Sequence, residues 1–246
     1  MNRPRLVRFV GYFWLPLFWI ALKYVAHISD RYLPDPIRVL TSATVVDPNI
    51  FTQSLYTISR FTVGFVGGTA LGVAIGLMLY RSRTLSYLLL PSIQSSRSVP
   101  AVAIIPFFLL WFGFSETGRY LLVLSGTALN IAIATLQISR SSPEKYVVMF
   151  TSYKVHPSFF PLRYGVPFVF ENILPTLRFS LASAIGLIVA SEMLGSQIGL
   201  GYLAQSARAT FSMDLLFLTV ISLGIISAIV DELLVIGWRT ALFWVR

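Results

Sequence analysis

Residues 61–80 read FTVGFVGGTALGVAIGLMLY, a run of twenty residues without a charged side chain. A helix that crosses a bilayer needs about 20 mostly apolar residues, so this run is long enough to span a membrane. Five further apolar runs occur, at residues 10–28, 85–112, 120–138, 173–194 and 215–238. They are too long for barrel strands of about 10 residues and do not alternate in polarity. The sequence therefore predicts an all-α, polytopic membrane protein with about six transmembrane helices.

Composition agrees with this class. The chain of 246 residues is 56% hydrophobic and 12% charged, whereas soluble domains carry about 25% charged residues. Its net charge of +9 comes from basic residues that fall singly between the apolar runs. This spacing favours membrane lipid headgroups as anionic neighbours and does not indicate a nucleic acid partner. We expect residues 1–246 to form a single transmembrane domain.

Several chemistries lack the residues they need. The chain has no cysteine, which excludes disulfides and thiolate metal sites. His27 and His156 are too far apart to indicate a metal site, and no Ser-His-Asp arrangement has a credible context. No glycine-rich phosphate loop followed by Lys-Ser or Lys-Thr occurs. The sequence therefore predicts neither a catalytic residue nor a nucleotide site in this chain.

The distribution of Lys and Arg predicts the orientation, because cytosolic loops carry an excess of both. With the N-terminus in the cytosol, the outside segments hold four, Arg31, Arg38, Arg119 and Arg208. The inside segments hold eleven: Arg3, Arg5, Arg8, Arg81, Arg83, Arg140, Lys145, Lys154, Arg163, Arg239 and Arg246. We therefore expect a multi-pass protein with both termini cytosolic.

Four glycines, Gly64, Gly68, Gly72 and Gly76, recur every fourth residue in the second run. This spacing places them on one helix face, where small residues let two helix backbones touch. The face either packs against another helix of the same chain or slides between two packing states.

Charges and prolines interrupt two other runs. The third run is expected to be broken by Pro91, Pro100 and Pro106. A broken helix at membrane depth lines a cavity or packs within protein. Arg97 in that run either snorkels or pairs within the bundle, or faces a water-filled pathway and attracts an anion. Glu192 is expected to pair with Arg97 or Arg60, or to contact a solute. Arg60, Arg97, Pro100, Pro106 and Glu192 are therefore candidates for a translocation pathway or gate.

Residues 139–172 form the one long loop that the charge rule places inside. Within it, Ser142, Pro143 and Glu144 are typical of a helix start. A short cytosolic helix between two spans either docks on a soluble partner or lies on the headgroups.

Three stretches together resemble the permease subunit of a bacterial ABC importer, in the branch for nitrate, sulfonate, taurine and bicarbonate. The first runs from Ser54 through Arg60 to Gly76. The second runs from PSIQ at 91–94 through Arg97 and LWFG at 110–113 to Glu116. The third contains ASEMLG at 190–195 and GLGYL at 199–203, and is the most specific.

The resemblance implies an alternating-access pathway in the bacterial inner membrane. Its partners would be a second permease subunit, expected to form a homodimer, two ATPase subunits that bind ATP and Mg, and a periplasmic substrate-binding protein. No cofactor is expected in this chain. The solute would be small and polar or anionic, such as a sulfonate, nitrate, bicarbonate or a vitamin precursor. A cytosolic coupling helix would dock on the ATPase through Phe150, Thr151, Ser152, Tyr153, Lys154, Val155, His156 and Pro157.

The coupling loop is where the sequence departs from this family. The family signature is Glu-Ala-Ala, three residues, then Gly, with Pro thirteen residues later. Counting back from Pro167 places the Gly at Lys154 and the first three residues at 148–150, and none matches. This mismatch has three possible explanations. The turn has another geometry, the groove on the ATPase is altered to fit, or the subunit does not couple to an ATPase. Two alternative functions are an ATP-independent carrier or channel, and a membrane scaffold that does not transport.

Overall fold

The computed structural model describes the backbone of residues 3–141, 152 and 166–242, and the side chains within these ranges except those of 3–13 and 97. Everything described is helical or connects helices, which confirms the all-α fold class. The helices are α1 (Arg3–Tyr24), α2 (Pro36–Ser42), α3 (Ile50–Arg81), α4 (Arg83–Ser98), α5 (Ala101–Phe112), α6 (Glu116–Arg140), α8 (Val166–Asn172), α9 (Leu174–Gly195), α10 (Leu200–Ala209) and α11 (Met213–Ala241).

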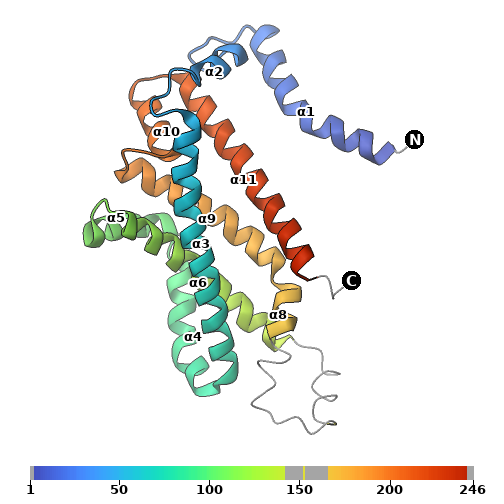
Figure 1. The fold of residues 1–246 in the computed structure, drawn as a ribbon, viewed down its shortest axis with the longest axis vertical. Helices are drawn as coiled ribbons and strands as arrows, with labels where there is room; N and C mark the ends of the chain where they lie inside the picture. The colour runs from blue at the N-terminus through green and yellow to red at the C-terminus, as the bar shows by residue number, and fades with distance from the viewer. Residues whose placement is uncertain (1–2, 142–151, 153–165, 243–246) are drawn as a thin grey trace.

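Four of these helices, α3, α6, α9 and α11, are long and apolar enough to cross a membrane. The helices α4 and α5 pass the same test only as a pair and meet at a bend of 96°, as in a broken span or a re-entrant loop. The first predicted span corresponds to α1, 22 residues long, which leads away from the bundle in Figure 1. These helices confirm a polytopic membrane protein.

The glycine face of α3 packs against α6 of the same chain. A Cβ atom added at Gly68 would lie 2.7 Å from the carbonyl oxygen of Leu124, and one at Gly76 would lie 2.6 Å from that of Ala132. The backbones therefore touch along the two helices, which run parallel, because partner numbers rise together. Of the two expected uses of this face, packing within the chain is the one seen; sliding stays a prediction.

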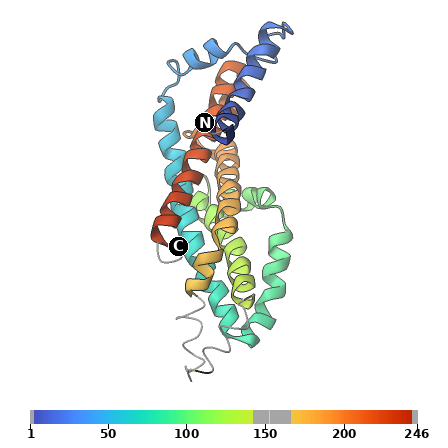
Figure 2. The ribbon, with the colours of Figure 1, turned by 90° about the vertical axis from the view of Figure 1, so that its right-hand side faces the viewer.

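The break in the third span falls at one proline and not at three. Pro91 lies inside α4 and Pro106 inside α5, so the expected breaks at these two positions are wrong. Val99 is extended, with φ −75° and ψ 125°, because a following proline disfavours helical geometry. Pro100 then precedes α5, which turns back toward the bundle while α4 stands at its flank (Figure 2).

The connections gather at two ends of the bundle. Helices α2 and α10 lie at one end, and α4 and α8 lie toward the other (Figure 1). At the latter end, Arg140 donates a hydrogen bond of 2.7 Å to the Ser86 hydroxyl, which joins the end of α6 to the first turns of α4. Trp238 of α11 donates to the Phe170 carbonyl of α8 at 2.9 Å. The ends of α3, α6 and α11 thus share one end of the molecule with the start of α9.

Candidate functional site

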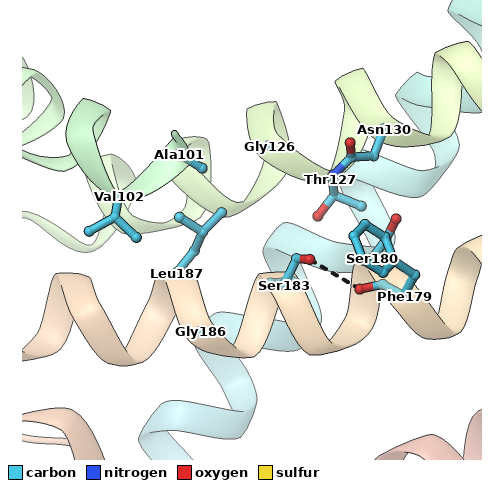
Figure 3. A pocket seen from close by; sticks show the side chains of 11 residues that line it. Ala101, Val102, Gly126, Thr127, Asn130, Phe179, Ser180, Ser183, Gly186 and Leu187 are labelled. Atoms are coloured by element: carbon cyan, nitrogen blue, oxygen red, sulfur yellow. Dashed lines mark hydrogen bonds between the residues drawn. The ribbon is translucent and has the colours of Figure 1, made fainter. Parts of the chain in front are cut away.

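A groove runs between α6 and α9, and the first turn of α5 forms its rim. Its main cavity has a volume of about 440 Å³. A second hollow of about 260 Å³ adjoins it, and Asn130 and Phe179 line both. In Figure 3, Thr127 and Asn130 of α6 face Phe179, Ser180 and Ser183 of α9, with Ala101 and Val102 of α5 beside them.

Polar residues recur with helical spacing along this groove. On α6 they are Thr127, Asn130 and Gln137, and on α9 they are Thr176, Ser180 and Ser183. Residues three, four or seven apart share a helix face. From Thr127 to Gln137 the stripe covers eleven residues of α6, or about 15 Å along the helix axis. The two spans thus present polar side chains to the groove at intervals, among apolar residues such as Phe179, Ala184 and Leu187.

Two hydroxyls in the groove wall have no partner among the described residues. Thr127 is 2% exposed and Ser180 is 1% exposed, and neither hydroxyl makes a hydrogen bond. A buried polar group without a partner costs about 1–3 kcal/mol. The Ser183 hydroxyl donates to the Phe179 carbonyl at 3.1 Å (Figure 3). The seam between α6 and α9 therefore holds hydrogen-bonding capacity that the described protein does not use.

The N-terminus of α5 adds positive potential at the groove. Ala101 and Val102 are its first residues, and both line the cavity. Its N-cap, Pro100, makes no side-chain capping hydrogen bond. The first N–H groups of a helix have no partner within the helix and carry the positive end of its dipole. The break at Pro100 thus places a helix start without a side-chain cap at the rim of a groove that carries both polar and apolar side chains.

A separate cluster of charges lies at the end of the bundle that carries α10. Glu192 is fully buried and accepts a hydrogen bond of 2.7 Å from Arg60. It also accepts from the Thr57 hydroxyl at 2.9 Å and from the Gly201 backbone N–H at 2.9 Å. Of the two expected partners, Arg60 is therefore the one that the structure brings to Glu192.

Arg60 extends this cluster to α6. Its guanidinium donates to both carboxylate oxygens of Glu116, at 2.7 and 2.6 Å, and to the Ile198 carbonyl at 2.7 Å. The Tyr56 ring centre lies 5.5 Å from the guanidinium carbon. Arg119 donates to Glu116 at 2.8 Å and also to the Gly195 carbonyl. Two arginines and two glutamates thus form a network without net charge.

The same cluster caps α10. The Gly199 N–H donates to Gln53 Oε1 at 2.5 Å, and the Leu200 N–H donates to Thr57 Oγ1 at 2.9 Å. The Gly201 N–H donates to the Glu192 carboxylate, so three side chains satisfy three successive N–H groups at the start of this helix. The cluster therefore fastens α3, α6, α9 and α10 together.

The sequence-predicted site residues fall in different places. Arg60 and Glu192 lie in the charge cluster, with exposed fractions of 1% and 0%, and not in the groove. Pro100 adjoins the groove through α5, and Pro106 lies further along that helix. The side chain of Arg97 lies outside the described residues.

Of the eight expected coupling residues, the structure describes one. Phe150, Thr151, Tyr153, Lys154, Val155, His156 and Pro157 lie outside the described residues, and Ser152 is helical and exposed.

Sequence reasoning missed the groove. Asn130, Thr127, Ser180 and Ser183 carry no charge, and each is unremarkable by itself. The available signal was their helical spacing within two apolar runs, since a polar stripe on a spanning helix faces protein or water. Arg119 was also missed as a member of the charge cluster, because it was counted as an outside loop residue.

Comparison with known proteins identifies the family. Residues 68–236 match the family described as "binding-protein-dependent transport system inner membrane component". The permease SsuC of Bacillus subtilis strain 168, named provisionally for aliphatic sulfonates transport, is 29% identical over 92% of this chain and 83% of its own. The taurine transport system permease TauC of Escherichia coli K12 is 23% identical over 87% of this chain and 80% of its own.

A solved structure agrees on the fold. The MetNI methionine ABC transporter, in an inward-facing conformation, contains a chain that superposes with a TM-score of 0.63 at 16% identity. The match covers 75% of this chain and 92% of that one. The expected resemblance is thereby confirmed: the chain belongs to the family of binding-protein-dependent transport system inner membrane components, the permeases of ABC importers.

Proposed function

We propose that this chain forms half of the pathway of an ATP-driven importer for small organic oxyanions, with aliphatic sulfonates as the first class to test. The relatives named for aliphatic sulfonates and taurine support the solute class. The groove between α6 and α9 is the observation that carries the proposal. Polar side chains on spanning helices are costly against lipid and therefore line protein or water-filled cavities.

A second copy of the chain would complete this pathway. The groove has walls from α5, α6 and α9 and is open on its remaining side. A second subunit facing it across a two-fold axis would enclose a passage, and two-fold homodimers are the commonest soluble assemblies. Crosslinking of the purified complex through paired single cysteines at Val102 would yield a covalent dimer of this chain. A strictly monomeric chain would contradict the homodimer.

Two ATPase subunits would drive this pathway from the cytosol, and a substrate-binding protein would deliver the solute on the other side. We place the end that carries α4 and α8 in the cytosol, because Arg81, Arg83 and Arg140 lie there. The expected coupling residues 150–157 lie in the sequence between α6 and α8. ATP would then shift the balance between two packings of the bundle.

The buried state of Glu192 disfavours the ATP-independent carrier. A proton relay needs an acid that meets the pathway, but this carboxylate is held by Arg60, Thr57 and the Gly201 N–H away from the groove. The decisive experiment is uptake into proteoliposomes that contain this chain, its ATPase and its binding protein. Uptake of taurine or butanesulfonate that requires ATP supports the proposal. Uptake driven by a proton gradient without ATP would refute it.

The orientation has its own experiment. Since the chain contains no cysteine, single-cysteine variants give an unambiguous labelling signal. The exposed positions Ser152 and Thr44 form a matched pair on the two predicted sides. In right-side-out vesicles, a membrane-impermeant maleimide is expected to label Thr44→Cys and to spare Ser152→Cys until the membrane is opened. The reverse pattern would invert the proposed topology.

A further inference from the structure

We infer that the groove between α6 and α9 holds the solute in transit by its oxyanion head, at the N-terminus of α5 and the amide of Asn130, with the aliphatic tail against Phe179. This inference rests on the proposed function and names the residues that would carry it. It also moves anion recognition away from Arg60, whose hydrogen bonds are directed to two glutamates and a carbonyl.

The start of α5 supplies the preference for an anion. Ala101 and Val102, the first two residues of a 12-residue helix, line the cavity, and the N-cap Pro100 makes no side-chain capping hydrogen bond. A helix N-terminus that points at a pathway favours negative groups through its dipole and its unpaired donors. In membrane carriers, half-helices of broken spans face anionic groups in this manner.

Neutral donors on α6 and α9 complete the head site. The side chain of Asn130 is partly exposed and makes no hydrogen bond within the described chain, so both its N–H donors are free. The Ser183 hydroxyl is engaged only with the Phe179 carbonyl at 3.1 Å, longer than the usual 2.7–2.8 Å of such a bond. The unpartnered hydroxyls of Thr127 and Ser180 lie beside them. Independently of α5, these groups indicate a ligand that forms hydrogen bonds.

Weak, neutral binding suits a transport site. A solute that paired with a buried arginine would leave slowly, whereas passage requires binding that is easily reversed. No charged side chain lines the cavity among the described residues. The helix dipole and amide would thus select an anion without trapping it.

Apolar surfaces in the same groove fit a short hydrocarbon tail. Phe179 is 63% exposed, lines both hollows and stands between the polar positions of α9. Val102 and Leu187 line the main cavity with it. The 440 Å³ volume lies in the range of cavities that hold small ligands. The site therefore fits a molecule with one oxyanion head and a short aliphatic tail.

Transport by paired variants at Val102 tests the head site. Val102→Asp places a carboxylate at the start of α5, where it favours the helix but repels an anion. Val102→Asn has nearly the same shape without the charge. In ATP-driven uptake of butanesulfonate, we expect Val102→Asp to raise KM at least tenfold more than Val102→Asn, because like charges within a few ångströms repel strongly. Equal KM values for the two variants would overturn the inference.

The contributions of the amide and the ring are tested separately. Asn130→Leu, which conserves side-chain size, is expected to raise KM about tenfold for every sulfonate, through loss of hydrogen bonds to a charged group. Phe179→Ala is expected to weaken uptake of butanesulfonate more than that of methanesulfonate, because only the former has a tail to bury. The control is Ser222→Ala on α11, whose hydroxyl donates to the Leu218 carbonyl as Ser183 does to Phe179. Wild-type KM in Asn130→Leu would contradict the head site.

A labelling experiment separates this inference from the proposed function, since it needs no transport. In the cysteine-free chain, Ser183→Cys within the assembled complex is expected to react with a hydrophilic thiol reagent. Butanesulfonate should slow the reaction and butylamine should not. Labelling that is indifferent to butanesulfonate overturns the solute site even if ATP-driven uptake is normal. Protection of Ser183→Cys in a complex that shows no ATP-driven uptake would instead refute the proposed function alone.

Discussion

Removal of the Glu192 carboxylate gives a stringent test of the charge cluster. The carboxylate is fully buried and accepts hydrogen bonds from Arg60, the Thr57 hydroxyl and the Gly201 N–H. Breaking a buried ion pair from one side costs about 3–5 kcal/mol, because it leaves an uncompensated charge. In Glu192→Ala, Arg60 keeps both its bonds to Glu116, so we expect the lower end, about 3 kcal/mol.

This loss converts into a measurable change in melting temperature. For chains of 150–250 residues, each kcal/mol lowers Tm by about 2–4 °C, so Glu192→Ala should melt about 6–12 °C below the wild type. The assay is thermal unfolding of the detergent-solubilised protein, followed by tryptophan fluorescence. Glu192→Gln retains an acceptor oxygen, so its Tm should lie between those of the wild type and Glu192→Ala.

The matched control is Glu232→Ala, because Glu232 is an exposed glutamate on spanning helix α11. A surface substitution of this kind changes stability by less than about 0.5 kcal/mol. If Glu192→Ala is as stable as Glu232→Ala, the cluster does not hold the four helices together, and the energetic reasoning fails.

Three further perturbations probe other parts of the fold by the same melting assay. Gly72→Ala would place a Cβ 2.8 Å from the Ala128 carbonyl oxygen and should cost about 1–3 kcal/mol by overpacking. Gly224→Ala has nothing within 4 Å and should melt like the wild type; equal melting of the two would dismiss the close approach of α3 and α6. Trp238→Phe loses one hydrogen bond of 2.9 Å to the backbone of α8 and should cost about 1 kcal/mol; an unchanged Tm would show that this bond adds nothing. Asp231→Ala removes the partner of Arg178 at 2.5 Å and, since both are partly exposed, should cost about 1 kcal/mol or less. The double variant Arg178→Asp, Asp231→Arg should regain the wild-type melting temperature. A double variant that stays destabilised would refute the pairing.

The prolines of the third span show where sequence reasoning stopped. Three prolines occur in residues 85–112, and local chemistry makes each a candidate break. Only Pro100 separates two helices, whereas Pro91 and Pro106 lie within them. Prolines are tolerated inside membrane helices when neighbouring groups satisfy the freed backbone. Which proline breaks the span therefore depends on packing that no local pattern contains.

Glu192 shows the same limit for an ion pair. Its burial cost predicts that it has a partner, and the sequence offers Arg60 and Arg97. Arg60 lies 132 positions away in the chain, and α3 and α9 bring it to a hydrogen-bond distance of 2.7 Å. The need for a partner follows from the residue type, while its identity follows from the fold.

The sequence by itself determined that this chain is a bundle of membrane-spanning helices, that α3 has a face made for close packing, and which family it belongs to. Each of these follows from residue type and spacing, because a bilayer accepts only long apolar helices whose backbone groups are satisfied internally. The tertiary structure decided that α6 receives the glycines, that Arg60 holds Glu192, and that α5 begins beside a polar groove. These depend on which faces meet, and long-range packing sets that choice.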